Sequence, residues 1–253
     1  MPIAIIPSRY GSSRLQGKPL MPIAGRPMIQ RVYEQAQKSA VVTDVWVATD
    51  DPRIVRAVAS FGGNAVMTSD TCRSGTDRVA ETAGILELAP DDIVINIQGD
   101  QPVFDPRCLD DLISPFDRDP EAAMTTLAFK IVDPREITDP KDVKVVFDRR
   151  GRALYFSRAQ IPFPRDAGTD TDYFKHLGFY AFKKSFLDHF VTLPTSRCEG
   201  VEKLEQLRAL EHGFPIQVTV TAFDSPEIDL PEDILRVENR LSNTGAPCSH
   251  TTK

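Results

Sequence analysis

The sequence has little of three features that would restrict its function at once: cysteine, histidine and long apolar runs. Its four cysteines and four histidines are scattered without CxxC or other metal-ligand spacing, so they offer no zinc site. They also form no disulfide framework, which favours a reducing compartment. No apolar run approaches the ~20 residues of a membrane helix, and the opening run IAII is too short for a signal peptide. We therefore expect a cytoplasmic protein without a membrane partner.

A surplus of positive charge is also missing. The 30 Lys and Arg residues are outnumbered by 36 Asp and Glu residues, which gives a formal net charge of -6. A nucleic-acid surface normally needs a broad excess of basic residues, so we expect no nucleic-acid partner. The 253 residues suffice for one α/β unit. We expect a single domain over residues 1–242 and a flexible polar tail over residues 243–253.

Short apolar strands alternate with amphipathic helices through the first half of the chain. Strands are predicted over residues 2–6, 44–50, 64–69 and 91–100, and helices over residues 26–40, 51–63, 76–86 and 106–116. Nearly continuous apolar strands separated by helices indicate a parallel sheet with helices on both faces. We therefore predict an α/β fold.

The pattern changes near residue 122, where strands follow one another without long helices. Strands are predicted over residues 124–130, 143–148, 153–158 and 176–182, with a hairpin turn at DRRGR. This indicates an antiparallel section over residues 122–182, which we expect to help form a homodimer. Residues 199–213 predict one continuous helix, with Val201, Leu204 and either Leu207 or Arg208 along one side and Gly213 at its end. A last strand over 214–223 and a last helix over 231–241 complete the chain.

The loop RYGSSRLQGKPL, directly after the first strand, combines two glycines with three cations: Arg9, Arg14 and Lys18. It matches neither a dinucleotide fingerprint nor a Walker A loop, since there is no G-x-G and Pro19 follows the lysine. In an open α/β sheet this loop lies where ligands bind. The composition favours a phosphate-binding loop; the alternative is a solvated basic loop.

Two carboxylates lie at positions suited to magnesium. Asp100 ends a buried strand in INIQGDQP, so it should face the same sheet edge as the basic loop. The alternative is that GDQP is simply a turn. Asp229, in EIDLPED, precedes the last helix and by itself reads more readily as a helix-start acid.

Nearly the whole chain, from Pro2 to about Leu241, resembles the 3-deoxy-manno-octulosonate (Kdo) cytidylyltransferase family of the lipopolysaccharide pathway. The resemblance lies in IIPSRYGSSRLQGKPL, SGTDR, INIQGDQP, ALYFSRAQIP, KHLGFYAF, KLEQLR and DLPED, in that order. It implies a nucleotide-diphospho-sugar transferase type of fold. It also implies a reaction in which CTP and Kdo give CMP-Kdo and pyrophosphate.

The resemblance further implies a role for each matching residue. Lys18, Arg14, Asp100 and Asp229 would be catalytic, and the last two would hold Mg²⁺. CTP would be bound by Pro7, Ser8, Arg9, Arg14, Lys18, Ser74, Gly75, Thr76, Asp77, Arg78 and Asp100. The sugar would contact Gln98, Arg158, His176, Tyr180, Glu205 and Gln206. Alternatively, Glu205 and Gln206 form an exposed helix face and His176 is a core histidine.

One departure from the family pattern concerns the sugar. Most members read QGDEP, whereas this chain has Gln101 in place of the glutamate. A branch that shares QGDQP activates an 8-amino-8-deoxy analogue of Kdo, so this analogue is an alternative substrate. Another acid sugar, such as sialic acid, and a non-catalytic nucleotide-binding regulator also remain open. A regulator would not need both Asp100 and Asp229, because a sensor requires affinity without transition-state stabilisation.

Overall fold

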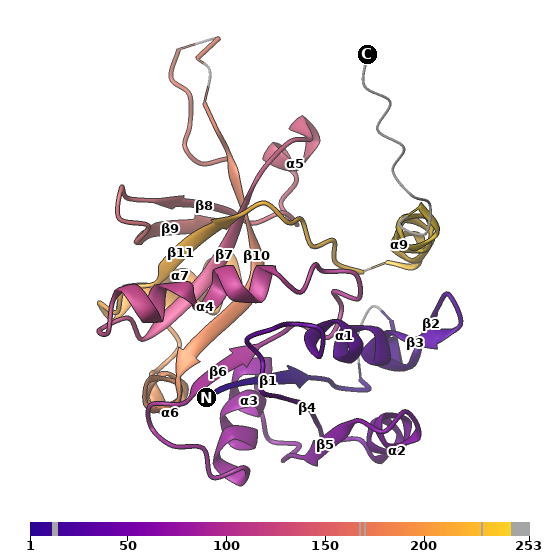
Figure 1. The fold of residues 1–253 in the computed structure, drawn as a ribbon. Coiled ribbons are helices and arrows are strands. Elements are labelled where there is room, and N and C mark those ends of the chain that lie inside the picture. The colour runs from indigo at the N-terminus through magenta and orange to yellow at the C-terminus, as the bar shows by residue number, and fades with distance from the viewer. Residues whose placement is uncertain (12–14, 167, 170, 229, 244–253) are drawn as a thin grey trace.

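The fold is built around one large mixed sheet (Figure 1). The computed structural model describes residues 1–11, 15–166, 168–169, 171–228 and 230–243. Within these residues the sheet has nine strands: β1 (Pro2–Pro7), β4 (Asp44–Thr49), β5 (Asn64–Met67), β6 (Ile93–Asn96), β7 (Met124–Lys130), β8 (Lys144–Phe147), β9 (Ala153–Ser157), β10 (Phe174–Lys183) and β11 (Gln217–Thr221). A separate small hairpin joins β2 (Pro22–Ile23) to β3 (Arg26–Pro27).

The two halves of the sheet differ in direction, as the sequence predicts. Strands β6, β1, β4 and β5 run parallel to one another. The long strand β10 is antiparallel to β6, β7 and β8, and β8 pairs with β9 as the hairpin predicted at DRRGR. Strand β11 then returns parallel to β7. The predicted α/β fold class is therefore confirmed, with the antiparallel section attached to the parallel half through β10.

Helices cover both faces of the sheet. They are α1 (Met28–Ala36), α2 (Pro52–Ser60), α3 (Gly75–Ile85), α4 (Cys108–Arg118), α5 (Pro134–Thr138), α6 (Lys184–Thr192), α7 (Arg197–Glu202), α8 (Leu207–Glu211) and α9 (Pro231–Asn243). Successive β1 side chains enter opposite cores: Ile3 and Ile5 pack with α3 and α6, while Ala4 and Ile6 pack with α1, α2 and α4. This is the two-sided burial expected of a parallel strand.

The continuous helix predicted over residues 199–213 is wrong. The chain forms α7, breaks at Lys203 in the left-handed conformation (φ 55°), and forms α8 from Leu207 onward. Leu204 is buried in the core at 6% exposure, whereas Val201 is 78% exposed. Their helical spacing therefore does not put them on one face. The break allows Leu204 to enter the core while Glu205 and Gln206 face a cavity.

Helix α6 and the short helix α5 were not predicted; both lie in or beside the antiparallel section. Helix α9 packs on a small core made by Ile23, Met28, Ile228 and Val237. It extends to Asn243, and the rest of the tail predicted over 243–253 lies outside the described residues. The single-domain boundary and the role of residues 122–182 in a dimer stay predictions.

The parallel half has a switch point at β1. The chain proceeds from β1 to β4 and β5 on one side, and then adds β6 on the other side of β1. Open α/β sheets bind ligands at the carboxyl ends of strands at such a point. Gly99 allows the close approach of the two strand ends, because a Cβ there would lie 3.1 Å from Ser8 Oγ and 3.2 Å from the Pro7 carbonyl oxygen.

Candidate active site

A small cavity of about 290 Å³ lies at the carboxyl ends of β1 and β6, beside the start of α3. Its walls contain Pro7, Ser8, Arg9, Lys18, Pro19, Cys72, Arg73, Ser74, Gly75, Arg78, Gln98, Gly99 and Asp100. Ser8 is buried and its Oγ has no hydrogen-bond partner within the described residues. Since buried polar atoms are nearly always paired in native proteins, this hydroxyl suits a bound polar ligand.

The start of α3 gives the small cavity an anion-binding wall. Ser74 caps the helix, its Oγ accepting a hydrogen bond from the Asp77 amide at 3.1 Å. Gly75 lies against β1, where a Cβ would come within 3.3 Å of Pro7 Cγ. Exposed amides at a helix start and the helix dipole both favour a phosphate here. These features agree with the CTP-binding role that the resemblance implies for Ser74 and Gly75.

Cations reach the small cavity from two directions. Arg9 is exposed on its wall, and the Lys18 ammonium lies 2.8 Å from Asp100 Oδ2. Arg78 is buried, donates to Thr68 Oγ1, and pairs with Asp50 at 3.0 Å. Because its charge is balanced by Asp50, Arg78 contributes shape and polarity more than net charge. Arg14, the third cation of the opening loop, lies outside the described residues.

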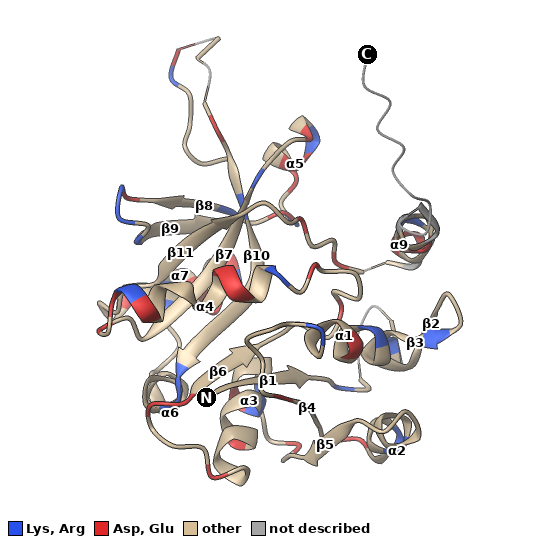
Figure 2. Cartoon of the chain, viewed as in Figure 1, with Lys and Arg blue, Asp and Glu red and all other residues tan. Residues whose placement is uncertain are grey.

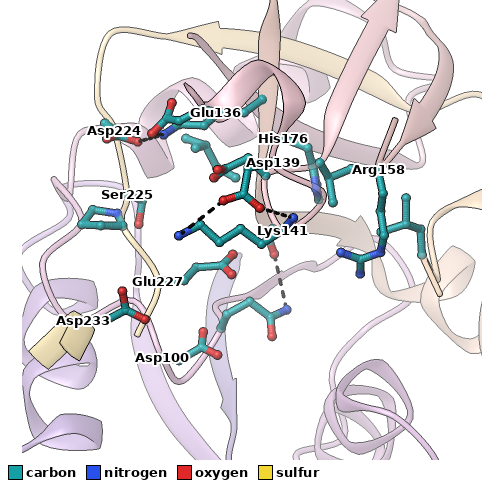
Figure 3. Close-up of a pocket in the computed structure, with 18 of the residues that line it drawn as sticks. Asp100, Glu136, Asp139, Lys141, Arg158, His176, Asp224, Ser225, Glu227 and Asp233 are labelled. Atoms are coloured by element: carbon teal, nitrogen blue, oxygen red, sulfur yellow. Dashed lines mark hydrogen bonds and ion pairs between the residues drawn. The ribbon is translucent and has the colours of Figure 1, made fainter. Parts of the chain in front are cut away.

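A large cavity of about 680 Å³ lies beyond the first one, over β10 and beside α5 (Figure 3). All six residues for which the resemblance implies sugar contacts line it: Gln98, Arg158, His176, Tyr180, Glu205 and Gln206. Gln206 is buried at 4% exposure, and its Nε2 donor has no partner among the residues that the structure describes. The exposed-helix alternative for Gln206 is therefore wrong, and the cavity offers a buried donor to a polar ligand.

His176 and Tyr180 line the large cavity from β10. The Nε2 atom of His176 lies 2.9 Å from Thr126 Oγ1, and burial lowers the pKa of His176 to about 3. His176 is thus neutral at physiological pH. Burial, with the nearby carboxylates of Glu205 and Glu227, raises the pKa of Tyr180 well above its usual value. Tyr180 therefore keeps its proton and can donate a hydrogen bond.

Glu205 connects the large cavity to the start of α3. Its Oε2 accepts a hydrogen bond of 2.5 Å from Thr76 Oγ1, at the start of α3, and its Oε1 lies 3.4 Å from Arg208. Burial raises its pKa, an effect that hydrogen bonds from Thr76 and Ser74 oppose. Thr76 is itself absent from the walls described for either cavity. Because Thr76 does not face either cavity, any effect of this residue on CTP would pass through its 2.5 Å hydrogen bond to Glu205.

The two cavities meet at Gln98 and Asp100, which line both. Gln98 is fixed there by a 3.3 Å hydrogen bond from its Nε2 to the Gly178 carbonyl oxygen of β10. The Asp100 side chain is 28% exposed, so its carboxylate is open to ligands while paired with Lys18. A group bound in one cavity can therefore approach a group bound in the other beside Asp100.

Asp100 has the chemistry of a magnesium ligand: a hard, anionic, partly exposed oxygen donor beside a wall suited to phosphates. No cluster of three metal-ligating side chains occurs within the described residues. Asp229, the second carboxylate for which the resemblance implies a metal, lies outside them. The donor set present fits an ion that takes most of its remaining ligands from phosphate oxygens and water.

Sequence reasoning missed the charged far end of the large cavity. Lys175 lies 2.8 Å from Glu136 and 3.0 Å from Asp224, and the carboxylates of Asp139, Asp142, Glu227 and Asp233 also line the cavity. Figure 2 shows acidic positions along the chain from the end of β11 toward α9. These residues come from the segment of α5 and the connection after it, from β10, and from the segment that runs from β11 into α9, and they have no shared motif or spacing. Only the path of the folded chain brings them together.

The comparisons with known proteins agree with this geometry. A family described as cytidylyltransferase matches residues 3–221. The chain belongs to the cytidylyltransferase family. A 3-deoxy-manno-octulosonate cytidylyltransferase of Desulfosudis oleivorans is 60% identical over 243 residues, covering 96% of this chain and 98% of that protein. An 8-amino-3,8-dideoxy-manno-octulosonate cytidylyltransferase of Shewanella piezotolerans is 56% identical over 239 residues, covering 94% and 97%.

A solved structure supports the same assignment. It is described as CMP:2-keto-3-deoxy-manno-octonic acid synthetase in complex with CTP. That chain shares 43% sequence identity and a TM-score of 0.89 with this cytidylyltransferase, and the match covers 96% of this chain and 99% of the other. The family and the fold predicted from the sequence are therefore confirmed. In the residues described, no helix is long and apolar enough to cross a membrane.

Proposed function

We propose that this cytidylyltransferase activates Kdo for lipopolysaccharide synthesis, converting CTP and Kdo to CMP-Kdo and pyrophosphate. The observation that carries the proposal is the pair of cavities that share Asp100 and Gln98, since it lets a nucleotide and a sugar meet. The family match and the names of relatives that are 60% and 61% identical support the same reaction.

The reaction needs positioning and charge stabilisation rather than a covalent enzyme intermediate. The anomeric hydroxyl oxygen of the sugar forms a bond to the α-phosphorus of CTP. The bond from that phosphorus to the bridging oxygen breaks, pyrophosphate leaves with the electron pair, and the hydroxyl proton passes to solvent. Negative charge moves toward pyrophosphate, which the Lys18 ammonium can stabilise by moving from Asp100 to the phosphates.

CTP would occupy the small cavity. Its phosphates would meet the start of α3 at Ser74 and Gly75, with Ser8, Arg9 and Lys18 on the opposite wall. Arg14 belongs to the same proposal through the sequence resemblance. Cytosine has an amino donor where uracil has an acceptor, so a pocket of acceptors would leave a buried group unpaired with UTP. We therefore expect preference for CTP.

The sugar acid would occupy the large cavity. The Arg158 guanidinium is held by two neutral carbonyl oxygens, those of Glu202 at 2.8 Å and Pro140 at 2.9 Å. Its charge is thereby available to a sugar carboxylate. Neutral His176, protonated Tyr180 and the unpaired Gln206 donor would contact sugar hydroxyls.

Magnesium belongs to the proposed active form, with Asp100 and Asp229 as its protein ligands. When bound, the ion would polarise the α-phosphate and neutralise phosphate charge. The Lys18 ammonium lies 2.8 Å from Asp100, so a cation donor and a carboxylate stand side by side at the junction of the cavities.

A panel of nucleotides and sugars tests the proposed reaction. Pyrophosphate release would be measured with CTP or UTP and with Kdo, its 8-amino analogue or sialic acid. We expect release only when CTP and an octulosonate sugar are both present. Release with the 8-amino analogue alone would establish the alternative substrate named for the Shewanella relatives. Nucleotide binding without release from any pair would instead indicate a regulator.

Two substitutions test the metal assignment. Asp100→Asn and Asp229→Asn should each abolish most magnesium-dependent turnover, although the residues lie 129 positions apart (229 minus 100). Loss of a helix-start acid alone would cost about 0.5–2 kcal/mol of stability and leave turnover intact. A lowered thermal midpoint with normal turnover in Asp229→Asn would therefore contradict the metal role of that residue.

A further inference from the structure

The buried side chain of Gln101 connects three parts of the active site. It is 0% exposed, and its Nε2 donates hydrogen bonds to the Leu177 carbonyl oxygen at 2.7 Å and to Glu227 Oε1 at 3.1 Å. Both neighbours are acceptors, so the nitrogen must face them, and both of its protons are used. The amide therefore joins the turn after β6 to β10 and to the segment that precedes α9.

Glu227 is held on the wall of the large cavity by this amide. The amide of the next residue, Ile228, donates a 3.0 Å hydrogen bond to the Asp100 carbonyl oxygen. The segment is thus fastened to the turn after β6 by its backbone and by the side chain of Gln101. Figure 3 shows the Glu227 carboxylate inside the cavity, on the side of Asp100 and Lys141. Glu227 is consequently placed where a sugar would meet the nucleotide.

The charge around Glu227 favours a ligand rich in donors. Nine acidic and six basic side chains line the large cavity. Most of those basic side chains already form ion pairs with acidic residues of the cavity: Lys175 pairs with Glu136 and Asp224, and Arg236 lies 2.9 Å from Asp233. A sugar acid entering this surplus of negative charge is bound best if its hydroxyl or ammonium groups donate to the carboxylates.

We propose that Glu227 is a specificity-determining residue whose carboxylate accepts a hydrogen bond from a donor group of the sugar acid, and that Gln101 is the positioning residue that holds it. The inference rests on the proposed function, because it assigns a role within the proposed sugar cavity. A carboxylate at position 101 could not donate to the Leu177 carbonyl. It would also bring a second negative charge to about the 3.1 Å that now separates the amide from Glu227.

Steady-state kinetics of Glu227→Gln with Kdo and with its 8-amino analogue test the role of Glu227. We expect the KM for the sugar to rise roughly tenfold or more, as for loss of a charge-assisted hydrogen bond, with the KM for CTP unchanged. A larger loss with the analogue would identify an ammonium as the donor, and equal losses would identify a hydroxyl. Unchanged sugar KM values with both substrates would overturn the proposal. Glu232→Gln, an exposed glutamate in the first turn of α9, is the matched control.

Substitutions at position 101 test the positioning role. Gln101→Glu should raise the KM for the sugar as Glu227→Gln does, again without changing the KM for CTP. The exchange Gln101→Glu with Glu227→Gln restores an amide–carboxylate pair but moves the charge away from the cavity. It should recover only part of the thermal midpoint that Gln101→Glu loses, because the Leu177 carbonyl oxygen still has no donor from position 101, and it should not recover the sugar KM. A normal sugar KM in Gln101→Glu would refute the positioning role.

Direct binding separates this inference from the proposed reaction. Calorimetric titration of wild type and Glu227→Gln with each sugar acid gives dissociation constants whether or not transfer occurs. Weaker sugar binding by the variant supports the role of Glu227 even if wild type releases no pyrophosphate, an outcome that would refute only the reaction. Equal dissociation constants for the two proteins would refute the inference and leave the reaction standing.

Discussion

The Lys18 ammonium lies 2.8 Å from Asp100, on a short 3-10 turn at the junction of the two cavities. It acts through charge rather than packing, so Lys18→Ala should lower turnover by orders of magnitude while the thermal midpoint changes little. Pyrophosphate release and thermal unfolding of the same preparation measure both effects. Lys38→Ala is the control, because Lys38 is an exposed lysine that bonds only Gln35 among the described contacts. Near-normal turnover of a folded Lys18→Ala protein would contradict the phosphate-binding role of the opening loop.

The burial of His176 leads to a prediction about the free energy of unfolding at acid pH. Burial lowers its folded-state pKa to about 3, against 6.5 for the unfolded chain, so only the unfolded state takes up a proton between these values. Its contribution to stability is present above pH 6.5 and is lost as the pH falls toward 3. Each pH unit between the two pKa values changes the free energy of unfolding by about 1.4 kcal/mol. Between pH 6.5 and 5 the free energy of unfolding of wild type should therefore fall by up to about 2 kcal/mol more than that of His176→Gln.

Urea denaturation at several pH values in that window checks this prediction. Exposed His189→Gln serves as the control and should follow the wild-type slope. The window stops at pH 5 because carboxylates begin to titrate below it. Parallel pH slopes for wild type and His176→Gln would show that His176 takes up its proton in the folded protein.

At the level of single elements, the irregularity in β10 shapes the site. Register with β7 shifts between His176 and Tyr180, and Gly178 has φ +73°. The shift turns the carbonyl oxygens of Leu177 and Gly178 toward the amides of Gln101 and Gln98. Strand β10 therefore holds both glutamines of the INIQGDQP segment, and with them the wall between the cavities.

Gly178→Ala tests the importance of this conformation. A Cβ there would meet its nearest neighbour at 3.5 Å, which is ordinary contact, so the cost is backbone strain of roughly 1–2 kcal/mol. We expect lower stability in urea and a higher sugar KM. Gly84→Ala in α3 is the matched control: its φ is ordinary, a Cβ there meets nothing within 4 Å, and stability should hold or rise by up to about 1 kcal/mol. Equal stabilities of the two variants would refute the strain argument.

The elements also show what the sequence could predict. The succession of nearly continuous apolar runs and amphipathic segments located the strands and helices of the parallel half, because burial on both faces makes a parallel strand apolar at most positions. Residues 199–213 defeated the same reasoning. Across the break at Lys203, buried Arg208 pairs with Glu199 at 2.5 Å, although residues nine positions apart would lie on opposite faces of one continuous helix. Spacing along the chain cannot report such pairs.

The candidate site likewise has a part that local sequence predicts and a part that depends on the fold. The start of α3 and the cation-rich loop after β1 follow from local sequence chemistry and the position of strand ends. The wall made by Asp142, Asp224 and Glu227 does not, because Asp142 lies in the connection between α5 and β8, whereas Asp224 and Glu227 lie in the distant connection between β11 and α9. Gln101 departs from the family pattern in the sequence itself, but its partners Leu177 and Glu227 lie 76 and 126 positions away and are brought to it only by the fold.

At the level of the whole molecule, the two halves of the sheet form different cavities. The parallel half supplies the helix start and loop of the small cavity, and the antiparallel half supplies most of the floor and walls of the large one. Thr76 and Glu205 join the halves across 129 positions of sequence. Coupling between the two ligands therefore has a physical route through packed, hydrogen-bonded residues rather than through a hinge.

The antiparallel half also exposes large apolar side chains. Leu154 is 62% exposed on β9, Phe163 is 79% exposed in the following loop, and Val201 is 78% exposed on α7. Helix α7 packs against the end of β9, where Glu202 accepts a 2.6 Å hydrogen bond from Ser157 Oγ. Large apolar side chains are costly to leave in water, so these residues are candidates for the interface of the homodimer expected from the sequence.

Light scattering after size exclusion tests this surface. Wild type should have a mass of about 56 kDa, twice the 28.1 kDa of one chain, and Leu154→Glu should shift it toward 28.1 kDa, because burying an unpaired carboxylate in an apolar interface is strongly unfavourable. Leu235→Glu places the same charge on α9, at a leucine that is 66% exposed, and should leave the mass unchanged. A monomeric wild type would refute the dimer, and a dimeric Leu154→Glu protein would place its interface elsewhere. Because Arg158 follows β9 directly and lines the large cavity, loss of this interface should also raise the KM for the sugar more than that for CTP.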